Sequence, residues 1–169
     1  MCAKKALQKP LVGIIMGSKS DLEIMREACL ALDSFNIPYE MNILSAHRTP
    51  DETAAYARGA EKKGIKVLIA GAGCAAHLAG VVTSHSILPV IGVPINASPL
   101  NGLDALLSTV QMPGGMPVAT VSIGKAGAKN AAILAAEILA TGDKTLKPKL
   151  RRYRARLSKA VLDSADEIK

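Results

Sequence analysis

Leu11-Val-Gly-Ile-Ile-Met16 leads directly into Gly17-Ser-Lys-Ser-Asp21, and apolar residues then recur at helical spacing as far as Leu32. The first run is almost continuously apolar, as is typical of parallel strands that are buried on both faces. The second run is a short loop of small and polar residues, in which Ser20 or Asp21 can cap the helix that follows. A strand, a polar loop and a helix in this order predict an α/β protein.

The same alternation continues to residue 140. Further strands are predicted at 39–44, 66–70, 88–94 and 118–123. Further helices are predicted at 51–63, 81–86, 103–110 and 124–140, with Asn36 and Gly64 at helix ends. Thr49 is predicted to be the N-cap of the first of these helices, with Pro50 at the first helical position. Five strands that alternate with helices predict a three-layer α/β/α sandwich around a parallel sheet.

The net charge of +7 is concentrated at the two ends of the chain. Residues 1–10 form a basic tail, and residues 143–169, a C-terminal helix and tail, carry nine basic and four acidic groups. The α/β domain at 11–142 is nearly neutral, with nine basic and ten acidic groups. Aromatic residues make up only 2% and Trp is absent, so surfaces for base stacking are scarce. We therefore expect no nucleic-acid partner.

The sequence shows no sign of a membrane or secretory segment. No apolar run reaches the roughly 18 residues that a membrane span needs, and polar residues and a proline at 8–10 interrupt a signal-peptide core. We expect a cytoplasmic protein. Cys2, Cys29 and Cys74 are too widely spaced for a disulfide framework or a zinc motif. Cys29 is expected in the core, whereas Cys74 lies in a glycine-rich loop.

A C-terminal amphipathic helix is predicted from about Asp143. Leu150, Tyr153, Leu157 and Val161 recur at helical spacing, opposite a row of basic residues. The helix follows an α/β body that is already complete, so its apolar stripe needs another surface. We expect this helix to pack on a neighbouring subunit.

Three loops at strand ends carry the candidate chemistry: 17–21, 45–50 and 71–80. The carboxyl ends of parallel strands share one edge of the sheet, where ligands bind. Serine hydroxyls, backbone N–H groups and an arginine suit a phosphate, a carboxylate suits ribose hydroxyls, and a histidine suits proton transfer. The side chains are Ser18, Ser20, Asp21, Ser45, His47, Arg48 and His77. They predict a sugar-phosphate site with a general acid/base, and no metal ligand set is evident.

Other readings of these loops stay open. The 17–21 loop can be a simple helix cap, and 45–50 can be an ordinary exposed loop. A flavin- or nucleotide-binding module would need ring-stacking aromatics, which the three loops lack. A cysteine hydrolase would pair Cys74 with His77, but no third group to orient them is evident.

Five motifs, in this order, closely resemble the PurE family, the catalytic subunit of phosphoribosylaminoimidazole carboxylase, also called N5-carboxyaminoimidazole ribonucleotide mutase. The resemblance runs from about residue 11 to about residue 160. The motifs are Gly17-Ser-Lys-Ser-Asp21, Ser45-Ala-His-Arg-Thr-Pro50, Gly71-Ala-Gly-Cys-Ala-Ala-His-Leu-Ala-Gly80, Gln111-Met-Pro113 and Gly124-Lys-Ala-Gly127.

The resemblance implies a flavodoxin-like homo-octamer with active sites between subunits and C-terminal helices that embrace neighbours. It implies an isomerase of de novo purine (IMP) biosynthesis, which converts N5-carboxyaminoimidazole ribonucleotide into 4-carboxy-5-aminoimidazole ribonucleotide. The reaction is a decarboxylation followed by a recarboxylation, and no metal, nucleotide or biotin cofactor takes part. A functional link to an ATP-dependent carboxyaminoimidazole ribonucleotide synthetase is also implied.

By position, the resemblance implies that Ser18, Asp21 and Arg48 bind the substrate. Arg48, with Ser20 and Ser45, would hold the 5′-phosphate, and Asp21 would bind the ribose hydroxyls.

The resemblance also implies that His47 is the general acid/base. The loop 72–78 would retain carbon dioxide, with Gly73 and His77 near the carboxylate.

Two positions depart from the family pattern: Cys74 stands where glycine is usual, and Ala79 where proline is frequent. The alternative within the family is direct carboxylation of aminoimidazole ribonucleotide by carbon dioxide, a lyase reaction. Arg48 and Pro50 favour the mutase branch.

Overall fold

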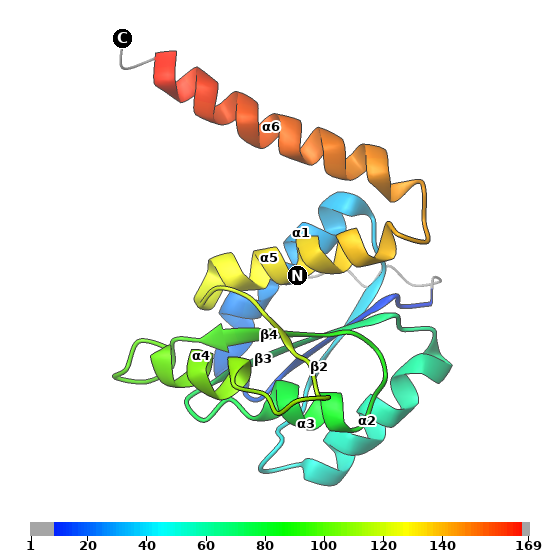
Figure 1. Ribbon diagram of the computed structural model, residues 1–169, viewed down its shortest axis with the longest axis vertical. Coiled ribbons are helices and arrows are strands. Elements are labelled where there is room, and N and C mark those ends of the chain that lie inside the picture. The colour runs from blue at the N-terminus through cyan, green and yellow to red at the C-terminus, as the bar shows by residue number, and fades with distance from the viewer. Residues whose placement is uncertain (1–8, 167–169) are drawn as a thin grey trace.

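The computed structural model describes residues 9–166 and confirms a five-stranded, all-parallel sheet (Figure 1). Its strands are β1 (Val12–Met16), β2 (Tyr39–Ile43), β3 (Val67–Gly73), β4 (Val90–Ile95) and β5 (Ala119–Thr120). Their order in the sheet is β2-β1-β3-β4-β5, which is the flavodoxin-like order. Of the predicted basic tail at 1–10, residues 1–8 lie outside the described residues.

Helices cover both faces of the sheet, so the three-layer prediction is also confirmed. They are the 3₁₀ turn η1 (Lys19–Asp21) and the helices α1 (Leu22–Phe35), α2 (Pro50–Lys63), α3 (Leu78–Ser84), α4 (Leu103–Val110), α5 (Gly124–Leu139) and α6 (Leu146–Asp166). The helices α1 and α5 pack on one face, and α2 and α3 pack on the other.

Strand β1 shows why the apolar run at 11–16 is nearly continuous. Ile14 and Met16 belong to the core formed with α1 and α5, whereas Ile15 belongs to the core formed with α2 and α3. All five residues of β1 are buried, because successive side chains point to opposite faces and both faces are covered. Cys29 of α1 is fully buried, as expected.

The predicted helix ends are confirmed by backbone geometry. Thr49 is the N-cap of α2 and Pro50 its first residue, a position where proline costs no hydrogen bond. Asn36 ends α1 at φ 57° and Gly64 ends α2 at φ 96°. Both lie in the left-handed region that asparagine and glycine tolerate best.

Three boundaries differ from the predictions. Strand β3 continues to Gly73, and α3 begins at Leu78, so the predicted 71–80 loop is reduced to four residues. Strand β5 is only two residues long, because only Ala119 and Thr120 pair with β4. Helix α6 begins at Leu146, which places Pro148 in its first turn, where a missing N–H is tolerated.

Helix α6 extends away from the body (Figure 1). Its first turns are attached to α1: the Tyr153 and Phe35 rings lie 5.5 Å apart, and Lys149 Nζ donates to the Phe35 carbonyl at 2.6 Å. From Arg154 to Ser164 every residue is exposed. No helix within residues 9–166 is long and apolar enough to cross a bilayer.

Candidate active site

A pocket of about 320 Å³ lies at the carboxyl ends of β1, β2 and β3. The strand order places β1 between β2 and β3, so the loops that follow these three strands meet there. Every site residue predicted from the sequence lines this pocket: Ser18, Ser20, Asp21, Ser45, His47, Arg48, Gly73 and His77. The predicted meeting of the three loops is therefore confirmed, whereas the role of each residue stays a prediction.

The first loop holds a buried carboxylate. Asp21 Oδ2 accepts the Ser18 backbone N–H at 3.0 Å, and Asp21 Oδ1 lies 3.3 Å from the Ser20 hydroxyl. Ser18 accepts the Ser20 N–H and caps the turn η1, and Asp21 completes this capping box. Asp21 is also the N-cap residue of α1, as one of the two predicted candidates, although its side chain makes no cap hydrogen bond to that helix. Burial raises the pKa of Asp21, while the hydrogen bonds from Ser18 and Ser20 and the charge of Arg48 partly oppose the rise. These contacts fix the carboxylate at the pocket, which Asp21 lines.

The second loop positions a guanidinium group. Arg48 Nη2 donates to the Gly17 carbonyl at 2.7 Å, and Arg48 Nε lies 3.3 Å from Ser45 Oγ. The bond to Gly17 links the loops after β1 and β2, and the contact with Ser45 lies within the loop after β2. The guanidinium has five N–H groups, so three remain for a ligand after these two are used.

Ser45 shapes this turn. It is buried, and its Oγ also accepts the Arg48 backbone N–H at 3.2 Å. The Thr49 side chain accepts the Ser45 N–H at 2.8 Å and donates to the Ser45 carbonyl at 3.1 Å. Because these contacts tie Ser45 to its own turn, its predicted phosphate contact has less support from the geometry than its role in orienting Arg48.

Two histidines from different loops contact each other. His47 Nε2 lies 2.9 Å from His77 Nδ1, with the rings 5.0 Å apart between centroids and nearly perpendicular at 88°. One nitrogen must carry the proton that the other accepts, so the tautomers of the two rings are coupled. The sequence predicted both histidines for the site but not their hydrogen bond.

The third loop has a backbone conformation that suits glycine. Cys74 lies at φ 54°, in the left-handed region, which explains why glycine is usual at this position. Its Sγ lies 3.8 Å from the Ala97 carbonyl. At Gly73 a Cβ atom would lie 2.5 Å from the Ala97 Cβ, so the loop after β4 approaches this backbone closely and excludes a side chain.

A residue that sequence reasoning missed holds this loop in place. Ser108 of α4 accepts the Ala76 N–H at 2.9 Å, and its hydroxyl lies 3.4 Å from the Cys74 carbonyl. Ala97 also lines the pocket. Neither residue follows β1, β2 or β3, and a lone serine or alanine carries no signal of its own.

Within residues 9–166, no three His, Cys, Asp or Glu side chains are grouped in a way that could hold a metal ion. The site can therefore be described by its anionic, cationic and imidazole groups. It combines a fixed carboxylate, a fixed guanidinium and a coupled imidazole pair around one pocket, an arrangement that suits a sugar phosphate and proton transfer.

The chain resembles known proteins over nearly its whole length. The sequence model for AIR carboxylase matches residues 11–160. An N5-carboxyaminoimidazole ribonucleotide mutase of Bacillus subtilis (strain 168) is 58% identical over 160 residues, which cover 95% of this chain and 99% of the relative. A protein of the same name from Pyrococcus horikoshii is 56% identical over 161 residues, which cover 95% of this chain and 90% of the relative.

The fold comparison agrees. The crystal structure of Treponema denticola PurE matches with a TM-score of 0.85 at 30% identity, covering 95% of this chain and 99% of that chain. The resemblance noted from the five motifs is thus confirmed by whole-chain similarity in sequence and in fold. This chain belongs to the AIR carboxylase family.

Proposed function

We propose that this chain is an N5-carboxyaminoimidazole ribonucleotide mutase of purine biosynthesis, which forms 4-carboxy-5-aminoimidazole ribonucleotide. One observation carries the proposal: the fixed Asp21 carboxylate, the fixed Arg48 guanidinium and the His47–His77 pair line one pocket. Family membership and relatives of this name support the same reaction.

Arg48 binds the 5′-phosphate, with the Ser20 hydroxyl as a second donor. A planar guanidinium matches two phosphate oxygens, and the bonds of Arg48 to Gly17 and Ser45 hold it in place before the substrate arrives. Asp21 accepts hydrogen bonds from the ribose hydroxyls, and the backbone N–H of Ser18 orients the Asp21 carboxylate. These contacts fix the position of the imidazole ring relative to His47.

His47 takes part in two proton transfers, one to N5 and one from C4. Protonated His47 gives its proton to N5 as the N5–carboxylate bond breaks, which releases carbon dioxide and leaves neutral aminoimidazole ribonucleotide. The electron-rich C4 then attacks carbon dioxide to form the new C–C bond. His47 removes the proton from C4, which restores the aromatic ring and returns His47 to its protonated form. No net proton or electron is consumed.

His77 is proposed to hold the His47 ring in position. The 2.9 Å contact places His47 Nε2 against a partner that can accept or supply a proton, so the ring of His47 keeps one orientation through both transfers. Gly73 and the rest of the 72–78 loop enclose the carbon dioxide formed between the two steps. Excluding water there also strengthens the polar contacts to the carboxylate.

The mutase reaction has one alternative, direct carboxylation of aminoimidazole ribonucleotide. Purified protein offered each substrate separately, with product absorbance as the readout, separates the two. Rapid turnover of N5-carboxyaminoimidazole ribonucleotide supports the mutase. Turnover of aminoimidazole ribonucleotide with bicarbonate alone would establish the carboxylase.

The chain is proposed to work as a homo-oligomer, an octamer by family resemblance. The outer half of α6 exposes Val161 by 70% and Leu162 by 66%, and α4 exposes Leu103, Leu107 and Val110. Such apolar faces favour burial in a contact between copies. Truncation before Lys147 is expected to reduce the particle mass measured by light scattering, and an unchanged mass would refute a role for α6.

The cytoplasm is the proposed compartment, because Cys74 is an exposed free thiol, and thiols are kept reduced in the cytosol. The substrate is a carbamate, which loses carbon dioxide readily in water. An ATP-dependent synthetase that carboxylates the amine is therefore the proposed supplier of the substrate.

A further inference from the structure

The loop between β3 and α3, residues 74–77, forms one wall of the candidate active site. Cys74, Ala75 and His77 line the pocket, whereas Ala76 between them does not. Ala76 is only 1% exposed, so it lies on the inner side of this β3–α3 loop, toward the body of the protein. The position of Ala76 therefore determines where the pocket-lining residues on either side of it lie.

One side chain of α4 holds Ala76 in place. The Ser108 hydroxyl accepts the Ala76 backbone N–H at 2.9 Å. The nearest acceptor for the single hydroxyl hydrogen of Ser108 lies in its own helix, the Asp104 carbonyl at 2.8 Å, and the Cys74 carbonyl is further away at 3.4 Å. A serine that donates to the carbonyl four residues earlier keeps its lone pairs free. Ser108 is thus an oriented acceptor for the Ala76 N–H.

Contacts with other segments hold the two ends of the β3–α3 loop. At its start, Cys74 Sγ lies 3.8 Å from the Ala97 carbonyl, in the segment after β4. At its end, His77 Nδ1 lies 2.9 Å from His47 Nε2, in the segment after β2. The bond to Ser108 lies between these two points and ties the inner side of the loop to α4. Without the Ser108 hydroxyl, a buried N–H would lose its acceptor, which is unfavourable.

We propose that Ser108 is a positioning residue, which keeps the β3–α3 loop over carbon dioxide between its release from N5 and its capture by C4. This role rests on the proposed mutase reaction, because carbon dioxide forms in the site only if that reaction takes place. Ser108 does not line the pocket, so it acts through Ala76 and not on the substrate. Loops that enclose a site are a general means of retaining reactive intermediates.

A displaced loop gives the intermediate a second fate. The N5–carboxylate bond breaks and N5 takes the proton of His47 as before, but carbon dioxide leaves before C4 attacks it. Aminoimidazole ribonucleotide is then released, and His47 takes a new proton from water. The ratio of released aminoimidazole ribonucleotide to 4-carboxy product therefore reports on the loop. A general loss of stability lowers the amount of active protein but leaves this ratio unchanged.

The test is a single-turnover reaction with the full-length protein in excess over N5-carboxyaminoimidazole ribonucleotide, in buffer free of carbon dioxide. Both products are quantified by chromatography, and a sample without protein corrects for spontaneous loss of carbon dioxide. In Ser108→Ala the ratio of released aminoimidazole ribonucleotide to 4-carboxy product should rise by about tenfold, because the hydrogen bond that holds the loop is lost. Ser108→Thr keeps the hydroxyl and should restore the wild-type ratio.

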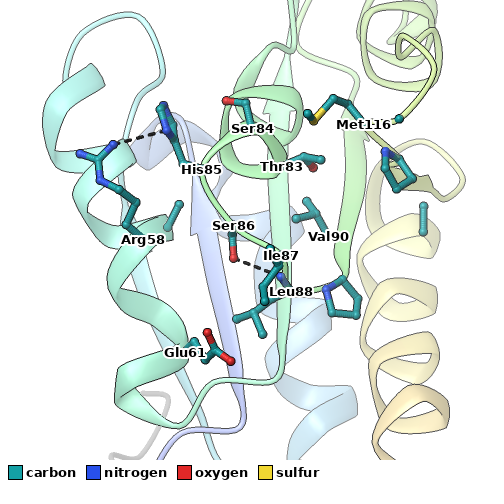
Figure 2. Close-up of a pocket in the computed structure, with 15 residues that line it drawn as sticks. Arg58, Glu61, Thr83, Ser84, His85, Ser86, Ile87, Leu88, Val90 and Met116 are labelled. Atoms are coloured by element: carbon teal, nitrogen blue, oxygen red, sulfur yellow. Dashed lines mark hydrogen bonds between the residues drawn. The ribbon is translucent and has the colours of Figure 1, made fainter.

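Ser86→Ala is the matched control. Ser86 Oγ accepts the Leu88 N–H at 3.2 Å, which is the same kind of contact between a serine hydroxyl and a loop N–H, beyond the C-terminal end of α3 (Figure 2). Both residues line a cavity of about 950 Å³ that shares no lining residue with the site pocket. Ser86→Ala should therefore keep the wild-type ratio.

Three results would overturn the role of Ser108. They are an unchanged ratio in Ser108→Ala, an equal rise in Ser86→Ala, and a Ser108→Thr variant that releases as much aminoimidazole ribonucleotide as Ser108→Ala does. Wild-type protein that forms no 4-carboxy product would instead refute the mutase function itself, and the role of Ser108 with it.

Discussion

Replacing His47 with asparagine is the most informative single change to the proposed mechanism. Asparagine keeps a polar side chain of moderate size but cannot take up and return a proton near neutral pH. Loss of a positioned acid/base typically lowers the rate by about 10²–10⁴-fold, which corresponds to roughly 3–5.5 kcal/mol in activation free energy. We expect kcat for N5-carboxyaminoimidazole ribonucleotide to fall by that factor.

Substrate binding and folding should change little in this variant. Asp21 and Arg48 take their positions from Ser18, Gly17 and Ser45, not from His47. KM is therefore expected to stay within about threefold of the wild-type value, because the contacts that bind the substrate and the transition state equally are retained. His47 is exposed, and among the described residues its side chain makes one hydrogen bond, to His77. Its loss costs about 1 kcal/mol, or about 2–4 °C in melting temperature for a chain of this size.

Steady-state kinetics and a thermal melt measure all three quantities. His85→Asn is the matched control, because His85 lies outside the catalytic pocket and should leave kcat unchanged. A kcat for His47→Asn within threefold of the wild type would remove His47 from proton transfer. A raised KM with unchanged kcat would instead make His47 a binding residue.

Two further predictions concern backbone packing and pH. Gly127→Ala should destabilise the fold by about 3 kcal/mol or more, because its Cβ would overlap the Ser122 carbonyl oxygen. Gly59→Ala, with no described atom within 4 Å of its Cβ, should stabilise the α2 helix by about 0.5–1 kcal/mol, and equal melting temperatures for the two variants would contradict this. Burial raises the pKa of Asp21 above 3.8, so kcat/KM should fall as the pH is lowered through that raised pKa and the carboxylate is protonated. Asp21→Asn should lower kcat/KM and remove this acid limb, and an unchanged limb would assign it to another group.

The fold was largely predictable because the apolar pattern reports burial directly. The run at 11–16 is apolar throughout because helices cover both faces of β1. Helix caps such as Thr49 and Gly64 depend on residues only a few positions away, so they can be recognised from the local sequence. Strand β5 was predicted too long because Val118 to Ile123 is apolar enough for a strand, whereas only Ala119 and Thr120 pair with β4.

The composition of the site was also predictable, but its internal contacts were not. Parallel strands bring their carboxyl ends to one edge, which placed His47 and His77 in the same region. Their hydrogen bond also depends on the strand order, in which only β1 lies between β2 and β3. The periodicity of the sequence does not reveal that order. Ser108 supports the 72–78 loop from α4, a contact across 32 residues of sequence that no local pattern signals.

In the proposed mechanism the carboxylate moves from N5 to C4 within one enclosed site. N5-Carboxyaminoimidazole ribonucleotide labelled with ¹³C in its carboxylate, incubated with the protein in excess unlabelled bicarbonate, tests this directly. A sample without protein corrects for spontaneous loss of the label. The mutase mechanism predicts that the C4 carboxylate of the product retains the label. A product that carries carbon from the bicarbonate would contradict the mechanism and indicate direct carboxylation.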